Sequence, residues 1–360
     1  MERHGLVRIV MTLAAAMAIV TPLAARPATA HAAPPAGNNA HRFVSVMTRN
    51  LDEGTDFGYI TAAVNGLMSF PDAISATYGE VLASGVCGRA ARVAKEIAAA
   101  QPDLVSLQEA AVWTGPAPAG CSGANSPTTI DAEAALMTEL AADGANYVVV
   151  GEQDEFGSSV IAPLLPPGLS FLDRDLLLAR VEDPEQLSVT NVTAAHFSTL
   201  LPLQLFPGVT ISITRGWISA DATLRGRTVR VIATHLESFY EPVQEAQAVE
   251  LAAGPANTTL PVIIAGDLNS GPGSAQLAAY NFLTTSASFT DTWTVTHPGE
   301  PGFTDAFYTE DPTTPAVLSE RIDLVLVRGN LVPTADIQVG GETPHPSDHA
   351  GIVATIRIPS

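Results

Sequence analysis

The chain has 360 residues, and its 37 Asp and Glu against 17 Lys and Arg give a formal net charge of −20 at pH 7. Lys95 is its single lysine. This balance argues against broad, non-specific binding to nucleic acid, which depends on cationic side chains that neutralise phosphates. Beyond the first 32 residues, no stretch approaches the ~20 uninterrupted apolar residues of a membrane-spanning helix.

Residues 1–32 have the pattern of a secretory signal peptide. Arginines precede an apolar run, and small residues at 28–32 offer cleavage sites, so we expect a secreted protein that is cleaved near residues 30–33. An N-terminal membrane anchor is the alternative, but a Thr-Pro pair breaks the apolar run and no stop-transfer charges follow it. Residues 33–41 then form a flexible leader rich in small residues and Pro, and 42–360 form one domain.

Strands and helices alternate along the domain. Apolar patterning predicts strands at 42–50, 103–110, 146–151, 175–181, 260–270, 321–329 and 351–358, and a strand pair at 217–238 that turns at Arg225-Gly226. Helical spacing predicts helices at 89–101, 128–144 and 241–254. This mixture favours an α/β fold in which two mixed sheets pack face to face with helices outside. A doubly wound parallel sheet is the alternative, but a helix does not regularly follow each strand.

Residues 152–216 differ from the rest of the domain, because their apolar segments 161–172 and 197–209 are broken by prolines. One interpretation is a long loop or hairpin that packs on the sandwich. The other is an exposed apolar lip across 161–209 that makes a peripheral contact with a membrane or another apolar substrate. The pattern favours the first interpretation.

The chain has two cysteines, Cys87 and Cys121, separated by 34 positions. In an exported protein, such a pair is typical of one disulfide across a loop. The alternative is two unrelated buried thiols, because spacing alone does not fix disulfide geometry. The sequence leaves the pairing open.

Residues that bind metals or move protons lie at the ends of strand after strand, either just after a strand or at its start: Asn50, Asp52, Glu109, His235, Asp267, Asn269, Asp323, Asp348 and His349. Any one of them has an ordinary explanation as a turn cap. Together they suggest one functional rim, because a sheet brings its strand ends and their loops to a common edge. Carboxylate and amide oxygens suit Mg²⁺, and a histidine oriented by a carboxylate suits a general base. The motifs of zinc proteases, serine hydrolases and nucleotide-binding loops are absent from the sequence.

Six segments in order resemble the endonuclease/exonuclease/phosphatase superfamily: "TRNLD" (48–52), "LVSLQEA" (104–110), "ATHLES" (233–238), "IIAGDLNS" (263–270), "RIDLVLV" (321–327) and "PSDHAGIVATI" (346–356). The resemblance covers roughly 42–359. It implies a four-layer α/β sandwich of the DNase I type and Mg²⁺-dependent cleavage of a phosphate ester, with Mn²⁺ or Ca²⁺ as alternative ions. Single motifs are weak, and their order is the specific signal.

The resemblance also implies roles for individual residues. The metal ligands would be centred on one glutamate and completed by neighbouring residues: Glu109, Asn50, Asp52 and Asp348. His349, paired with Asp323, would act as base or proton relay. Asp267 and Asn269 would position the attacking water, and His235 would contact the phosphate.

These motifs favour a secreted metal-dependent phosphoesterase whose substrate is nucleic acid, a phospholipid headgroup or a small phosphomonoester. A non-catalytic extracellular binding module on the same fold is the alternative, and we expect no stable protein partner. The sequence departs from the nucleases of the family, because basic residues that would track a phosphate backbone are not obvious. Tyr147 suits the core, and Asp173-Arg174-Asp175 either faces the cleft or forms a solvated ion pair.

Overall fold

The computed structural model describes residues 43–116, 121, 126, 128–182, 186–206, 208–306, 318–341 and 343–359. The expected signal peptide and leader, 1–32 and 33–41, lie outside the described residues. Among the helices of the described part, none combines the length and apolar character needed to cross a bilayer.

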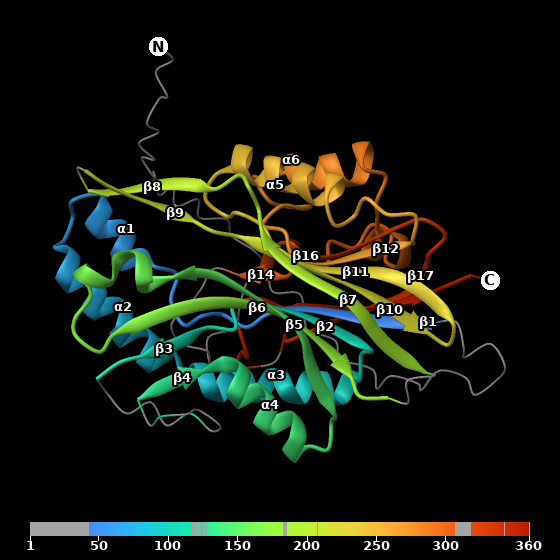
Figure 1. The fold of residues 1–360 in the computed structure, drawn as a ribbon, viewed down its shortest axis with the longest axis horizontal. Coiled ribbons are helices and arrows are strands. Elements are labelled where there is room, and N and C mark those ends of the chain that lie inside the picture. The colour runs from blue at the N-terminus through green and yellow to red at the C-terminus, as the bar shows by residue number, and fades with distance from the viewer. Residues whose placement is uncertain are drawn as a thin grey trace, which may run out of the picture.

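The first sheet has eight strands and is mixed (Figure 1). Its order is β17-β18-β1-β2-β6-β3-β4, and β5 also pairs with β6. Their bounds are β1 (Phe43–Asn50), β2 (Leu104–Gln108), β3 (Val112–Thr114), β4 (Thr129–Asp131), β5 (Tyr147–Gly157), β6 (Ser170–Arg180), β17 (Val332–Val339) and β18 (Gly351–Arg357).

The second sheet has six strands in the order β13-β16-β12-β11-β10-β7. Its strands are β7 (Leu187–His196), β10 (Gly216–Leu224), β11 (Arg227–His235), β12 (Val262–Asp267), β13 (Thr290–Asp291) and β16 (Asp323–Arg328). Two small antiparallel pairs stand apart from both sheets: β8 (Leu201–Phe206) with β9 (Val209–Ile213), and β14 (Asp305–Ala306) with β15 (Leu318–Glu320).

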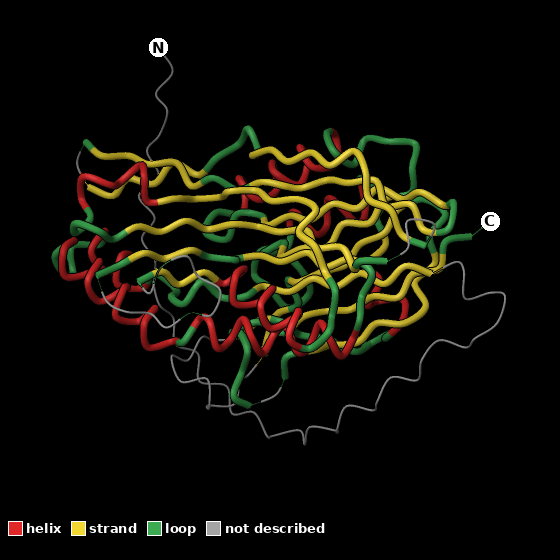
Figure 2. The backbone as a smooth tube through the Cα atoms, turned by 60° about the horizontal axis from the view of Figure 1, so that its bottom comes forward, coloured by secondary structure: helices red, strands yellow, loops and turns green. Residues whose placement is uncertain are grey.

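Helices cover the outer faces of both sheets, as Figure 2 shows in red. On the first sheet lie α2 (Phe70–Ser84), α3 (Val86–Ala100) and α4 (Ala132–Ala142), and α1 (Gly58–Val64) packs beside α2. Later in the chain come α5 (Glu241–Ala253), α6 (Ala278–Asn281), the π-helical turn η3 (Phe282–Ser286) and α7 (Thr292–Thr296). A 3₁₀ helix, η2 (Ser158–Leu164), joins β5 to β6.

Three apolar cores hold the layers together. One lies between the sheets, where Val46 of β1 and Val231 of β11 belong to the same cluster. The second packs the first sheet on α2, α3 and α4, and the third packs the second sheet on α5 and η3. The order helix, sheet, sheet, helix confirms the predicted four-layer α/β sandwich.

Most predicted elements occur where the patterning places them. The strand pair β10–β11 turns at Arg225 and Gly226, which both have positive φ, as the tight hairpin requires. The structure also has elements that the patterning did not predict, including α1, α2, β7 and β17. The segment 152–216 contains strands and a separate hairpin, β8–β9, rather than one long loop.

Cys87 at the start of α3 forms a disulfide with Cys121, and their Cα atoms lie 5.4 Å apart. The bond links α3 to the segment that precedes β4. This resolves the pairing that the sequence left open in favour of a disulfide.

Candidate active site

The pairing of strands brings the predicted polar residues to one rim of the sandwich. The parallel pair β1–β2 aligns Asn50 with Gln108, so Glu109 follows at the next position. In the second sheet, the parallel pair β11–β12 aligns His235 with Asp267. The antiparallel neighbour β16 begins opposite that aspartate, at Asp323. Carboxyl ends of parallel strands meet at the same sheet edge, and the two packed sheets contribute two such edges.

Hydrogen bonds connect the two sheets at this rim. The Asn50 side-chain nitrogen donates to Glu109 Oε1 at 2.9 Å and to Asp267 Oδ2 at 3.1 Å. The second oxygen of Glu109 accepts from the Glu53 backbone N–H at 3.0 Å. Asn269 donates through its side chain to the Leu236 carbonyl at 3.0 Å. Asn50 therefore fixes one carboxylate from each sheet.

Three of the strand-end residues have left-handed backbone conformations. Asp52, Glu109 and Asn269 have φ values of 61°, 57° and 48°. Such conformations are uncommon outside glycine and cost free energy, and they concentrate where a side chain has to point in a particular direction. Glu109 directly follows β2, and Asp52 and Asn269 come two residues after β1 and β12, so these turns set the directions of side chains at the strand ends.

His349 is held by Asp323 inside the site. Its Nδ1 lies 2.8 Å from Asp323 Oδ2, and its Nε2 lies 3.9 Å from Asp267 Oδ2 and 3.7 Å from Asp305 Oδ1. Burial opposes a charge on this imidazole, but Asp323, Asp348 and Asp267 outweigh it and raise the pKa of His349 well above its usual value. The histidine is therefore protonated at neutral pH in the metal-free protein.

His235 has the opposite electrostatic environment. Arg215 donates from its guanidinium to His235 Nδ1 at 3.2 Å. Burial, with Arg215 and His349 nearby, places the pKa of His235 well below its usual value, so the ring is neutral. Because an arginine only donates, Nδ1 accepts and the proton sits on Nε2. That Nε2–H faces the site, 3.6 Å from Asp267 Oδ2.

Two other predicted metal ligands, Asp52 and Asp348, have different surroundings: Asp52 is bound by other groups of the protein, and Asp348 lines a cleft. Arg89 forms an ion pair of 2.5 Å with Asp52, and the Gly54 N–H donates to the same carboxylate at 2.7 Å. Both carboxylate oxygens of Asp52 are therefore already bound by other groups of the protein. Asp348 is half-buried beside the cleft described below, and it contributes to raising the pKa of Glu109.

Other residues build the site without a signal in the patterning. Arg49 is fully buried, pairs with Glu96 at 2.9 Å and donates to the His349 carbonyl, so it anchors the loop before β18. Arg215 pairs with Asp173 at 2.9 Å, which places Asp173 in the cleft rather than in a solvated pair. An arginine in a loop or a strand ordinarily lies on the surface. Only the three-dimensional structure therefore identifies Arg49 and Arg215 as residues that build the site. Tyr147 lies in the core, as expected, and donates to the Pro102 carbonyl at 2.7 Å.

The donor set fits a hard divalent cation. Glu109, His235 and Asp267 offer ligand atoms that lie within 4.8 Å of one another, and so do Asp267, Asp323 and His349. Burial, with Asp348 and Asp173 nearby, raises the pKa of Glu109 to about 8, and burial with Asp323 nearby raises that of Asp267 to about 6. Buried carboxylates with raised pKa values repel one another, and a cation between them would remove that repulsion.

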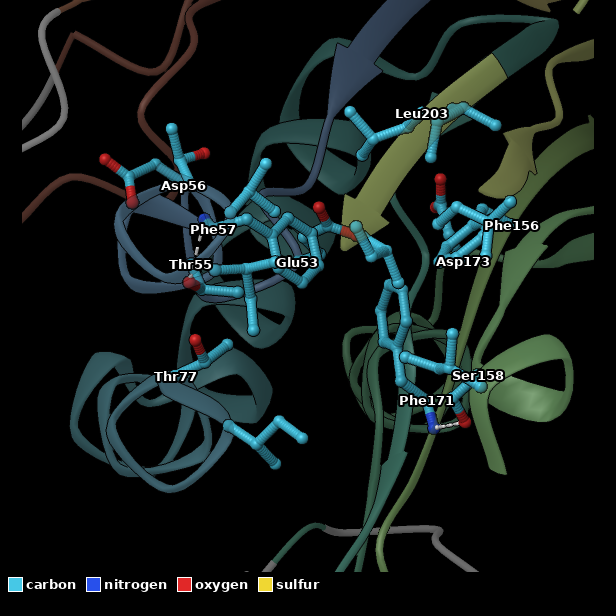
Figure 3. Close-up of a pocket in the computed structure, with 18 of the residues that line it drawn as sticks. Glu53, Thr55, Asp56, Phe57, Thr77, Phe156, Ser158, Phe171, Asp173 and Leu203 are labelled. Atoms are coloured by element: carbon cyan, nitrogen blue, oxygen red, sulfur yellow. Dashed lines mark hydrogen bonds between the residues drawn. The ribbon is translucent and has the colours of Figure 1, made fainter. Parts of the chain in front are cut away.

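An apolar cleft of about 430 Å³ opens beside these carboxylates. Its lining includes Glu109, Asn269 and Asp348, and most of its other lining side chains are apolar. In Figure 3, Phe57, Phe156, Phe171 and Leu203 surround this space from the start of α1, from β5, from β6 and from β8. Its volume is within the range of small-molecule sites.

Solved structures share the fold at low sequence identity. An endonuclease/exonuclease/phosphatase from Beutenbergia cavernae is 20% identical with a TM-score of 0.53, covering 88% of this chain and 72% of that one. A family protein from Leptotrichia buccalis is 13% identical with a TM-score of 0.55, covering 88% and 100%. The catalytic domain of human Nocturnin, solved with a bound sulfate anion, is 16% identical with a TM-score of 0.53, covering 89% and 94%.

Sequence comparison identifies the family. No curated protein matches the chain at a significant level. The sequence profile of the Endonuclease/Exonuclease/phosphatase family matches residues 82–349, which is most of the domain. Members of this superfamily are hydrolytic phosphoesterases and typically depend on a divalent metal ion. The chain therefore belongs to the Endonuclease/Exonuclease/phosphatase family, the same family that its ordered motifs resemble.

Proposed function

We propose that the protein is a secreted, Mg²⁺-dependent phosphoesterase that cleaves a phosphate ester by in-line attack of water. The observation that carries this proposal is the convergence of Glu109, Asp267 and the His349–Asp323 pair at one rim. A buried imidazole paired with a carboxylate beside carboxylates of raised pKa is typical of hydrolytic sites.

We assign Glu109 to hold the ion, with Asp348 as a further oxygen donor at the cleft, and Asn50 joins Glu109 to Asp267. Their oxygens are ligands of the kind that Mg²⁺ accepts, and Mn²⁺ suits the same set. A bound divalent ion would offset charge on the phosphoryl and leaving oxygens. We assign Asp52 to shaping the loop after β1, because Arg89 occupies its carboxylate.

The histidines are assigned to the phosphate. Neutral His235 donates from Nε2–H to a phosphoryl oxygen, and Arg215 maintains that tautomer. Protonated His349 donates from Nε2 to a second oxygen while Asp323 orients its ring. Because Asp323 holds Nδ1, Nε2 faces the site and is placed to donate to that oxygen when the ring is protonated.

Asp267 is then the group that accepts the proton of the attacking water. Its carboxylate lies between the two histidines, and the backbone N–H of Asn269 donates to its other oxygen at 2.8 Å. The water oxygen forms a bond to phosphorus as the ester P–O bond breaks. The leaving oxygen departs with the bonding pair and takes a proton from solvent, and Asp267 returns its proton to solvent.

Hydrolysis of bis(p-nitrophenyl) phosphate and p-nitrophenyl phosphate by the purified protein, with Mg²⁺ or with EDTA, tests this proposal. We expect Mg²⁺-dependent release of p-nitrophenol, and His349→Ala should lower kcat by roughly 10²–10⁴-fold. His297→Ala is the matched control, since His297 stacks on Trp293 outside the site. Mg²⁺ binding without hydrolysis of either ester would instead indicate a non-catalytic binding module.

Secretion is a separate part of the proposal. It is supported by the N-terminal pattern of residues 1–32 and by the Cys87–Cys121 disulfide, because disulfides persist in oxidising compartments. N-terminal sequencing of protein recovered from the culture medium should find a chain that begins between residues 30 and 33. Retention of the full-length chain in the cell membrane would contradict it.

A further inference from the structure

The cleft beside the carboxylates has one wall that is built for apolar contact. In the hairpin β8–β9, Leu201 pairs with Ile213 and Leu203 with Ile211, while Pro202 pairs with Ser212. Successive residues of a strand point to opposite faces, so the aliphatic pairs share one face and the polar pairs share the other. All four of those aliphatic residues line the cleft.

These side chains are buried or half-buried, but they lie apart from the three main core clusters. Leu201, Leu205 and Ile211 are only 4%, 4% and 9% exposed, yet none of them is part of the three core clusters that the described residues form. The hairpin pairs with neither main sheet and lies over α1 (Figure 1). Its buried face therefore encloses the cleft rather than filling a core.

The opposite wall is also apolar. Phe57 and Trp113 lie with their ring centroids 6.4 Å apart, and Phe171 lies 4.2 Å from the same tryptophan. Ile161 of η2 completes this side. A hydrocarbon chain placed here would have apolar surface on both sides.

The cleft has little to attract a polyanion. Arg215 is the cation among its described lining residues, and it is already bound to Asp173 and His235. Asp56 and Asp348 add negative charge to the same lining. A nucleic acid strand would bring a second and third phosphate next to these carboxylates, whereas an uncharged chain would not.

We propose that the cleft binds the alkyl or acyl chain of an amphiphilic phosphate ester, whose single phosphate lies at the Glu109 end. This inference rests on the proposed function, and it identifies the substrate class of the same site. The continuity of the apolar walls with the catalytic carboxylates is what selects this occupant. The outer face of the hairpin carries Pro202, Thr210 and Ser212, so its aliphatic face is the one that an alkyl chain in the cleft would contact.

A series of p-nitrophenyl alkyl phosphates with methyl, butyl and octyl chains, used with Mg²⁺ below their micelle concentrations, tests the proposal. Each buried methylene should raise kcat/KM by about two- to fourfold, so the octyl ester should exceed the methyl ester by roughly 100-fold or more. Thymidine 5′-p-nitrophenyl phosphate provides the nucleotide comparison and should be hydrolysed no faster than the methyl ester.

Variants locate the effect in the hairpin. Leu203→Thr places a polar group on the cleft face and should lower the octyl-to-methyl ratio of kcat/KM by several-fold. Gln204→Thr introduces a threonine on the opposite face of the hairpin as a control. The octyl-to-methyl ratio of kcat/KM of this variant should equal that of the wild type. Ile213→Thr is a second cleft-face variant, and circular dichroism checks that all three proteins fold.

The outcomes separate this inference from the function on which it rests. If all three alkyl esters are hydrolysed with similar kcat/KM values, the proposal that the cleft binds an alkyl chain is wrong. The proposed phosphoesterase activity would still stand. Preference for the thymidine ester would overturn it in favour of nucleic acid. Failure to hydrolyse any ester would overturn the proposed function, and this inference with it.

Discussion

Two histidines of one site show how neighbouring charges set chemistry at the scale of a residue. His349 faces Asp323 and is protonated, whereas His235 faces Arg215 and is neutral. Both rings are buried, and burial alone would lower the pKa of each. The partner on Nδ1 therefore decides which ring carries a charge, and it also decides which atom faces the phosphate.

Arg215 should act as a positioning residue through His235. Burial is the main cause of the low pKa of His235, and repulsion by Arg215 adds to it, so the pKa should rise in Arg215→Gln, where that repulsion is lost. We expect kcat/KM to fall by roughly 10- to 100-fold, as is typical when the partner of a site residue is removed. NMR titration of the His235 ring measures the pKa directly, with Arg225→Gln at the β10–β11 turn as control. An unchanged His235 pKa would show that the arginine serves only packing.

The sequence identifies residues of the site unevenly. The strand-end residues from Asn50 to His349 were predictable, because polar residues at the ends of apolar strands are a visible local pattern. Arg215 was not predictable as a site residue, because an arginine that precedes a strand ordinarily lies on the surface. The engagement of Asp52 by Arg89 was also invisible, since nothing local links positions so far apart in the chain.

At the scale of elements, the hairpin β8–β9 shows a choice that patterning left open, because both a long loop and a hairpin suited 152–216. Aliphatic and polar residues alternate within 201–213, as in a strand pair. The prolines at 202 and 207 nevertheless suggested that no regular strand runs through this segment. The hairpin tolerates Pro202 because it belongs to a two-stranded pair with free edges. The helices α1 and α2 were missed because 53–84 lacks a clear apolar period, although α2 has an N-cap at Ser69.

The disulfide should stabilise the packing of α3 against the segment before β4. Replacing Cys87 and Cys121 together by Ala removes a covalent loop of 34 residues, and chain-entropy arguments give a loss of about 4 kcal/mol in the free energy of unfolding. Urea unfolding of the double variant and of wild type measures this difference. Dithiothreitol should destabilise wild type and leave the variant unchanged. Equal unfolding midpoints without reductant would contradict the prediction.

At the scale of the whole molecule, the sandwich was predictable because strands and helices alternate with lengths that suit two covered sheets. The strand order was not, because β6 pairs with β2, β3 and β5, and these contacts depend on partners distant in the sequence. The family resemblance implied one rim for the site, and the structure gives the reason. Parallel ends of β1–β2 and β11–β12 meet there across the sandwich.

The excess of buried acid at that rim makes the stability of the whole protein depend on pH. Burial raises the pKa of Asp267, Asp305 and Glu109 to about 6, 7 and 8. In the unfolded chain such carboxyls titrate near pH 4, so the folded protein binds more protons between about pH 4 and 8. His349 acts in the same direction, because its stabilising charge is complete below its unfolded pKa and is lost as pH rises through its higher folded pKa.

Stability of the metal-free protein should therefore fall as pH rises from 5 to 8, since the folded state has to release those protons. His235 has the opposite effect below about pH 6.5, because its pKa is lower in the folded protein than in the unfolded chain. Its effect is outweighed by the carboxyl groups and His349 together. A divalent ion competes with the same protons, so Mg²⁺ should raise Tm more at pH 8 than at pH 5. Thermal unfolding in EDTA and in Mg²⁺ across this range measures both effects, and Glu109→Gln should reduce both. A Tm that rises with pH in EDTA would contradict the assignment of these carboxylates as a metal site.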